Sequence, residues 1–380
     1  MNNMLSWSLK RLVLNRHSWW VAVLWLMWIL PAQAAEIRVA VRNNTSQVQI
    51  GSSTTGVVRD SRGQTVMQLP ELQPLTVNGD NGRLELLGDR NSFGASSTFW
   101  LEPSNGGVVW IGDRWYRGKV KLVPGDYGVT AVNYVDIDDY LYSVVGSEMP
   151  TSWPQEALRS QAVAARSYAL YHQGKASGRS FDVNSTQSSQ VYKGLQGEAP
   201  STQEAVDATS GKVITHGGRV IEAVFHSSSG GHTENSEHVW STAVPYLKGV
   251  PDFDQNAPVY SWRAQFSLED VGARIGYPGT ISAVEVLSRS PRGRAKRMTI
   301  IGNAGTLTVT GNTFRQKLGL RSTKFDLSVS PTGISVAGNG FGHGIGMSQW
   351  GARGMAESGQ KYDKILTHFY NGTRLGSMND

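Results

Sequence analysis

The stretch GSEMPTSWPQEALRSQAVAARSYAL, residues 146–170, sets one carboxylate, Glu148, directly ahead of a helical pattern. Ser152 followed three residues later by Gln155 matches a capping box, so we expect a helix to begin near Trp153. A carboxylate before a helix can cap it or interact with its dipole. Since Ser152 is the better placed cap, Glu148 is left for another purpose.

The expected helix carries a stripe of mostly small side chains at helical spacing: Leu158, Ala162, Ala165 and Ala169. Small residues let the helix approach its neighbours closely, and Arg166 lies at the edge of the stripe. We expect Glu148, between a strand end and such a helix, to be partly removed from water, which raises the pKa of a carboxyl toward the range of a general acid. Glu148 with Arg166 is therefore our first candidate site.

Residues 36–139, which precede this stretch, consist of short apolar runs separated by turn residues. Ile37, Val39 and Val41 recur at every second position, as do Val120 and Leu122. Alternation with a period of two indicates strands, and we expect this part to be antiparallel β.

The first 35 residues resemble a secretory signal peptide, with a basic start, an apolar run from Trp19 to Leu30 and a small-residue end. A transmembrane anchor is the alternative, but twelve apolar residues fall short of the roughly 20 that a spanning helix needs. We therefore expect an exported protein, in a periplasm or cell wall, without a stable transmembrane anchor.

Charge and cysteine content narrow the classes of partner. The formal charge of +6 falls to +3 without the leader, which holds three basic and no acidic residues. Without a basic cluster this mild excess does not indicate nucleic acid, although it suits an anionic polymer. The chain has no cysteine, so disulfides, thiol nucleophiles and cysteine-bound metals are excluded.

Beyond the first helix the pattern mixes both kinds of element. We expect a second helix over 202–210, then strands joined by a two-glycine hairpin turn at Gly217 and Gly218. Residues 251–335 read as a mixed α/β insert with a helix near 268–275. Near the end, Ser348 is placed to cap a helix to about Glu357. A last helix should bury three apolar residues: Ile365, Leu366 and Phe369.

The segment GNGFGHGIGMSQWGARG is the second candidate site. Its glycines alternate from Gly338 to Gly346, so an extended chain would carry them all on one face, with His343 on the other. A face without side chains lets a backbone or ligand approach closely. The alternative is a turn that needs glycine only for its geometry. We assign substrate contacts to His343, Ser348 and Gln349.

Two other groups of residues are weaker candidates for a functional site. The segment FHSSSGGHTENSEHVW holds His226, His232 and His238 with two glutamates, but the spacing fits no established zinc pattern, and an exposed polar loop is the plainer interpretation. A serine triad lacks the G-x-S-x-G elbow and a base for Ser228 or Ser229. We expect no metal and no other cofactor.

Three blocks in order resemble the stage II sporulation protein D and amidase-enhancer family: YLYSVVGSEMPTSWPQEALRSQAVAARSYAL, VFHSSSGGHTENSEHVW and the glycine-rich C-terminal block. The resemblance covers roughly residues 36–375. It implies an exported cell-wall protein whose sporulation branch cleaves peptidoglycan glycan strands as a lytic transglycosylase. The family's E-M-P glutamate corresponds to Glu148 and its A-A-R arginine to Arg166. The amidase-enhancer branch instead stimulates a partner amidase.

This chain differs from some members of that family in the middle block. Some members hold a metal with a cysteine in the middle block, where this chain has Ser227, Ser228 and Ser229. A metal is therefore not expected near His226 and His232.

Together these observations predict an α+β protein: a signal peptide (1–35), a β-rich part (36–139) and a catalytic region (140–376) with the insert at 251–335. The catalytic helix region, the insert and the glycine-rich segment should form one cleft. We expect catalysis by Glu148 with Arg166 on peptidoglycan glycan strands. A noncatalytic enhancer of a cell-wall amidase is the alternative, and a purely structural envelope protein is a third reading.

Overall fold

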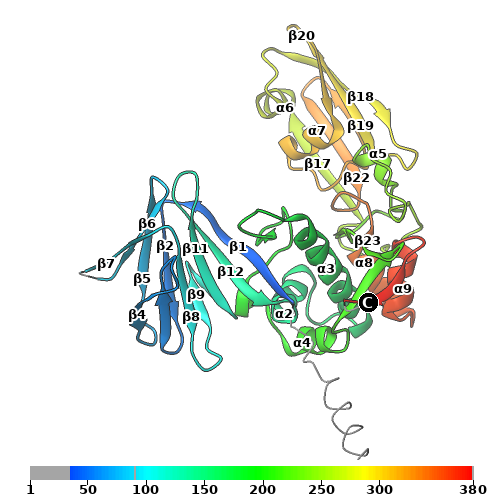
Figure 1. The fold of residues 1–380 in the computed structure, drawn as a ribbon. Helices are drawn as coiled ribbons and strands as arrows, with labels where there is room; N and C mark the ends of the chain where they lie inside the picture. The colour runs from blue at the N-terminus through cyan, green and yellow to red at the C-terminus, as the bar shows by residue number, and fades with distance from the viewer. Residues whose placement is uncertain (1–34, 90, 379–380) are drawn as a thin grey trace, which may run out of the picture. The chain divides into compact units, whose positions relative to one another are not determined.

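The computed structural model describes residues 35–89 and 91–378, and the expected signal peptide, except for its last residue, lies outside them. The chain contains both helices and strands, and the strands form several sheets, so the α+β class is confirmed (Figure 1). In the described part of the chain, no helix is both long and apolar enough to span a membrane.

The first part is antiparallel β, as expected. One seven-stranded sheet runs β13-β1-β12-β11-β8-β3-β4, and a six-stranded sheet runs β10-β9-β2-β5-β6-β7. Ile37, Val39, Val120 and Leu122 are fully buried, which confirms the alternation seen in the sequence. The strands of this part are β1 (Glu36–Thr45), β2 (Gln47–Ser52), β3 (Gly56–Arg59), β4 (Thr65–Leu69), β5 (Leu75–Asp80), β6 (Arg83–Leu87), β7 (Ser92–Ser96), β8 (Phe99–Pro103), β9 (Val109–Ile111), β10 (Arg114–Tyr116), β11 (Lys119–Pro124) and β12 (Val129–Asp136).

A helix that the sequence reading missed follows the sheet: α2 (Ile137–Glu148). Asp136 ends β12 and caps the helix, because its carboxylate accepts from the backbone N–H of Asp138 at 2.8 Å. Residues 137–139, expected to be strand, are the first turn of this helix. The β-branched and aromatic residues of the segment mask its helical period, since they favour strands in isolation. Glu148 is thus the last residue of a helix.

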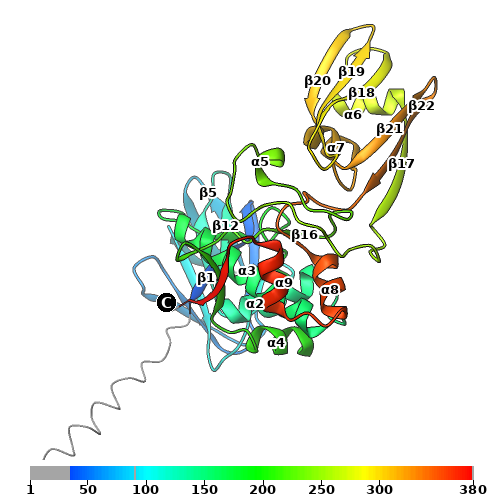
Figure 2. The same ribbon diagram turned by 90° about the vertical axis from the view of Figure 1, so that its right-hand side faces the viewer.

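The next helix, α3 (Gln155–Lys175), begins two residues later than expected. Its N-cap is Pro154, which makes no side-chain cap bond, and the capping box at Ser152 is wrong. The Gln155 amide instead donates to the Ser201 carbonyl at 3.1 Å. The small-residue stripe is fully buried, as predicted. Because the side chains of this stripe are small, α3 packs closely against α2, α4 (Pro200–Asp207), α8 (Gln349–Glu357) and α9 (Tyr362–Phe369), as Figures 1 and 2 show.

Short elements connect α3 to the insert: β13 (Val183–Asn184), a 3₁₀ turn (Gly194–Gly197), α4 (Pro200–Asp207), β14 (Lys212–His216), β15 (Arg219–Val220), β16 (Phe225–His226) and α5 (Ser236–Val239). Gly217 and Gly218 have φ of 57° and 76°, so the two-glycine hairpin turn is confirmed. The expected second helix forms two residues earlier, with Pro200 in its first turn.

The insert has its own apolar core, in which Val271, Met298, Ile300 and Phe314 are fully buried. Its helix α6 (Leu268–Ile275) is confirmed, whereas α7 (Gly311–Leu318) and β21 (Phe325–Ser330) were not foreseen. The other strands are β17 (Ser261–Ser267), β18 (Ile281–Arg289), β19 (Ala295–Gly302), β20 (Gly305–Thr310) and β22 (Gly333–Asn339).

The glycine-rich segment is not an extended strand with all its glycines on one face, and that expectation is wrong. Gly340, Gly342, Gly344 and Gly346 have φ between 68° and 113°, a region open mainly to glycine, so the chain folds back on itself. The interpretation as a turn that requires glycine is the correct one. The chain then forms β23 (Met347–Ser348), α8 (Gln349–Glu357), α9 (Tyr362–Phe369) and β24 (Arg374–Ser377).

Both C-terminal helices agree with the sequence. Ser348 caps α8 by accepting from the backbone N–H of Gly351 at 3.1 Å. Ile365, Leu366 and Phe369 of α9 are fully buried.

Candidate functional site

Glu148 lies half-buried at the C-terminal end of α2. Its Oε1 accepts one hydrogen bond, from the backbone N–H of Val191 at 2.8 Å. Burial raises the pKa of the Glu148 carboxyl, and this effect outweighs the opposing effects of the Val191 N–H, the Gln349 amide and the Lys193 charge. The partial negative charge at a helix C-terminus further disfavours the ionised form. Both effects therefore shift the pKa of Glu148 upward from that of a solvated glutamate.

A segment after β13 holds Val191 against the end of α2. The backbone N–H of Lys193 donates to the Ser143 hydroxyl at 3.2 Å, and the buried Tyr140 hydroxyl donates to Gln190 at 2.9 Å. Gln190 in turn donates to the Ala165 carbonyl of α3 at 3.3 Å. This support was not found from the sequence, because contacts between the backbone and side chains of a polar connecting segment leave no periodic signal.

Gln349 brings the C-terminal segment to Glu148. Its Nε2 donates to the backbone carbonyl of Glu148 at 3.1 Å, and it is the first residue of α8. Ser348, expected to bind substrate, is fully buried and is occupied as the cap of α8. Of the C-terminal residues expected at the site, Gln349 is the one that reaches Glu148.

His343 is held through both of its ring nitrogens. Nε2 lies 2.9 Å from the Phe225 carbonyl, and Nδ1 accepts from the Ile345 N–H at 3.1 Å. Together these bonds define a neutral ring protonated at Nε2. Burial and the charges of Arg294 and Arg315 lower the pKa of His343 to about 4. Within residues 35–89 and 91–378, His343 and Glu148 share no hydrogen bond.

The two histidines of the middle and C-terminal blocks are neighbours. β16 pairs in parallel with β23, so His226 lies opposite Ser348, and the His226 and His343 rings are 5.1 Å apart between centroids. The exposed Trp240 contacts the His343 ring at 5.5 Å. His343 therefore organises a backbone turn and presents a ring face beside Trp240.

The histidines and glutamates of the middle block do not converge. His232 bonds the Thr233 carbonyl, Glu237 pairs with Lys248 at 3.0 Å and Glu234 accepts from the Arg292 N–H. No set of three His, Asp or Glu that could hold a metal occurs in the described part of the chain. These residues do not form the closed ligand shell of a structural zinc site.

The two serines of this block belong to a buried acidic pair. Ser228 donates to Asp254 and Ser229 to Asp252, and all four side chains are nearly or fully buried. Burial and the charge of Asp254 raise the pKa of Asp252 to about 7. Among the described residues, the hydroxyls of Ser228 and Ser229 are thus engaged by carboxylates.

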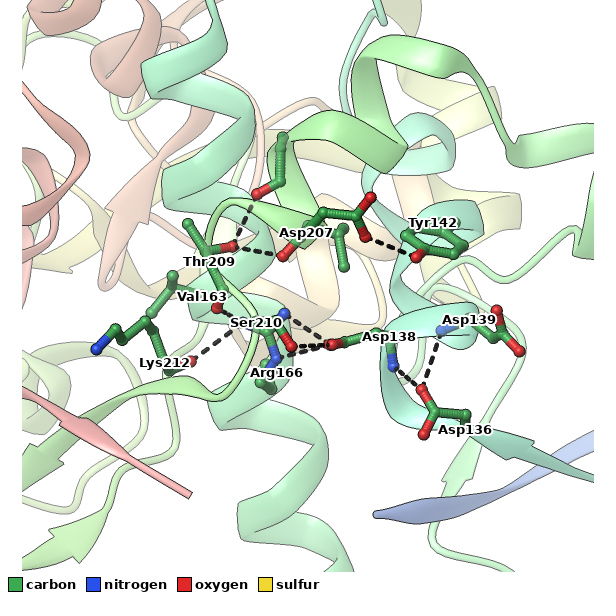
Figure 3. A network of polar contacts seen from close by, with 12 residues as sticks. Asp136, Asp138, Asp139, Tyr142, Val163, Arg166, Asp207, Thr209, Ser210 and Lys212 are labelled. Atoms are coloured by element: carbon green, nitrogen blue, oxygen red, sulfur yellow. Dashed lines mark hydrogen bonds and ion pairs between the residues drawn. The ribbon is translucent and has the colours of Figure 1, made fainter. Parts of the chain in front are cut away.

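Arg166 lies in a separate place, at the other end of α2 (Figure 3). Its guanidinium is fully buried and pairs with Asp138 at 2.8 Å. It also donates to the carbonyls of Thr209 at 2.8 Å and Lys212 at 3.1 Å. Ten residues of α2 separate Asp138 from Glu148, a rise of about 15 Å. The structure thus places Arg166 among α2, α4 and β14, apart from Glu148.

These features define an α+β protein in which Glu148 is partly desolvated at the end of α2, beside the backbone of Val191 and the first residue of α8. A sequence profile of the stage II sporulation protein family matches residues 126–216, and a profile described as a domain of unknown function matches residues 234–346. Stage II sporulation protein D of Bacillus subtilis is 33% identical, over 64% of this chain and 76% of that protein. The chain therefore belongs to the stage II sporulation protein D family.

Two other relatives extend the comparison. An uncharacterized protein of Brachyspira hyodysenteriae is 36% identical over 70% of this chain and 73% of its own length. The amidase enhancer of Bacillus subtilis is 30% identical over 62% of this chain, but the match covers 40% of that longer protein.

Proposed function

We propose that this protein is exported to the periplasm or cell wall and cleaves peptidoglycan glycan strands as a lytic transglycosylase, with Glu148 as general acid and base. The observation that carries the proposal is the raised pKa of a carboxyl that is half-buried at a helix C-terminus. No second carboxylate among the described residues contributes to that pKa. A lytic transglycosylase requires one carboxyl, whereas hydrolases generally use two.

The reaction divides into two proton transfers. Protonated Glu148 gives its proton to the glycosidic oxygen, and the bond from that oxygen to C1 of the muramoyl residue breaks. The resulting carboxylate then takes the proton of the 6-hydroxyl while O6 bonds to C1. The products are a free 4-hydroxyl and a 1,6-anhydro end, and Glu148 is protonated again without water being consumed. The Val191 N–H stabilises the carboxylate between the two steps.

The test compares the protein with Glu148→Gln on glycan strands, both intact and stripped of stem peptides, with mass spectrometry of the products. We expect anhydro-ended fragments from the parent protein and at least a thousandfold fewer from the variant, because the amide cannot transfer the proton. Glu204→Gln, at a side chain 62% exposed on α4, makes the same chemical change away from the site and should cleave normally. Equal products from both variants would rule out Glu148 as the acid.

A second function is favoured by the relationship to the amidase enhancer. In that case the protein binds the wall or an amidase and breaks no glycosidic bond. Stimulation of a purified cell-wall amidase by the parent protein and by Glu148→Gln to the same extent, with no anhydro product from either, would establish this alternative.

A further inference from the structure

Two tryptophans lie side by side on the β-rich part. Trp110 of β9 is directly opposite Trp115 of β10, and their rings are 5.3 Å apart at an angle of 67°. Val109 and Ile111, which flank Trp110 in sequence, are fully buried. Since side chains alternate along a strand, Trp110 points to the outer face of the sheet, where both tryptophans are half-buried.

A glycine leaves the next position on this face open. Gly51 of β2 pairs with Trp110, and β2 and β9 lie side by side in Figure 1. Leu72, Gln73 and Pro74 form the opposite side. The result is a hollow of about 260 Å³ with Gly51 as its floor and the two tryptophans as one wall.

Leu72 at the rim is unusual in two ways. It is 68% exposed, and its φ of 58° lies in the left-handed region, which is unfavourable for leucine. Its backbone N–H donates to the Ser52 carbonyl at 2.8 Å, which fixes this turn beside the floor. An apolar side chain is therefore presented to solvent against both its hydrophobic and its conformational preference, and such strain is concentrated at functional positions.

We propose that this hollow, which we call the tryptophan groove, binds a sugar ring of a glycan strand at a second site distinct from Glu148. A pyranose has a face of C–H groups and a rim of hydroxyls. The faces of Trp110 and Trp115 suit the C–H groups, and the Gln73 amide offers a donor and an acceptor for the rim. The choice of glycan rests on the proposed function, whereas the existence of the groove does not.

The dimensions favour a sugar over a protein partner. A stable protein interface generally buries more than about 1,000 Å² and contains a large apolar centre. The apolar side chains here are few and enclose room for about one ring: Leu72, Pro74, Trp110 and Trp115. Tryptophan pairs also lose little conformational freedom when a flat ligand covers them.

The experiment measures co-sedimentation with insoluble peptidoglycan, and tryptophan fluorescence on titration with soluble N-acetylglucosamine oligomers, all in the Glu148→Gln background. We expect Trp110→Ala and Trp115→Ala each to weaken binding by about tenfold. Gly51→Leu should weaken it similarly by filling the floor, since an added Cβ meets nothing closer than 3.5 Å. Tyr127→Ala, at an aromatic side chain 86% exposed in the same part, is the matched control and should bind normally.

Leu72→Gly separates binding from folding. Glycine relieves the left-handed strain, so this variant should fold at least as stably while binding peptidoglycan more weakly. Unchanged binding by all the groove variants would overturn the proposal. The proposal would also be overturned if the groove variants bind glycan normally but fail to stimulate an amidase. That result would mean that the groove binds a protein partner.

The proposal for the tryptophan groove and the proposal for Glu148 can be tested separately. With an otherwise unmodified Glu148, Trp110→Ala should lower cleavage of insoluble peptidoglycan but leave cleavage of short soluble strands unchanged. If no strand is cleaved by any form and the groove variants still lose binding, the groove stands and the proposed chemistry falls.

Discussion

The chemistry of Glu148 depends on where its carboxyl lies, because burial rather than a charged neighbour raises the pKa. The folded protein therefore holds the Glu148 proton more tightly than the unfolded chain does. The corresponding stability is complete below the unfolded pKa, about 4.3, and is lost as the pH rises through the higher native pKa.

This linkage predicts a pH-dependent difference between the parent protein and Glu148→Gln. Glutamine cannot ionise, so the variant should gain thermal stability relative to the parent as the pH rises from about 4 to 8. The measurement is the Tm of both proteins across that range, with Glu204→Gln as control. Parallel Tm curves would mean that Glu148 is as well solvated when folded as when unfolded.

At the scale of elements, Arg166 joins α2 to α4 and β14 through one ion pair and two carbonyls. Arg166→Lys keeps the charge but loses the planar fork that bonds Asp138 and the carbonyls of Thr209 and Lys212 at the same time, so part of this network is lost. We expect a loss of about 2–4 kcal/mol in the free energy of unfolding, measured in urea. Arg274→Lys, in an exposed pair with Asp270, should change it by less than about 0.5 kcal/mol.

Activity distinguishes an indirect role of Arg166 from a direct one. A residue that only positions α2 should leave the cleavage rate per folded molecule nearly intact at low temperature. A large loss of kcat in a fully folded Arg166→Lys variant would mean that the guanidinium reaches the substrate.

Elements with a strong period or a local cap could be predicted from the sequence. The buried stripe of α3, the Ser348 cap and the apolar face of α9 each depend on residues close together in the chain. The capping box at Ser152 is not formed although its pattern is present, because α3 starts two residues later, with Pro154 at the N-cap position, and the Gln155 amide is bonded to Ser201. Local signals compete, and tertiary contacts decide between them.

The candidate site, too, could be predicted only where local residues decide the structure. Residue identity pointed to Glu148, but the Val191 N–H and the Gln190 relay depend on contacts across 43 and 50 residues of sequence. The partner of Arg166 could not be predicted for a related reason, because only the fold pairs its guanidinium with Asp138 of α2. Long-range backbone contacts leave no pattern that a single sequence can display.

At the scale of the whole molecule, the insert contacts the glycine turn that precedes α8. Arg294, between β18 and β19, is 2% exposed, and its Nη2 donates to the Ser229 carbonyl at 3.2 Å. A Cβ added to Gly344 would lie 1.9 Å from that same nitrogen. The guanidinium therefore occupies the space that glycine leaves in the turn carrying His343.

Gly344→Ala should consequently destabilise the protein more than a matched glycine substitution. Gly359 has a similar φ, 84°, but a Cβ there meets no atom within 4 Å, so Gly359→Ala measures backbone strain alone. We expect Gly344→Ala to cost about 1–3 kcal/mol more, because a buried arginine cannot move aside freely. In an Arg294→Ala background the extra cost should disappear, a coupling measurable by a double-mutant cycle in urea. If the two substitutions instead add independently, the insert does not support the turn, and His343 is held by β16 and β23 alone.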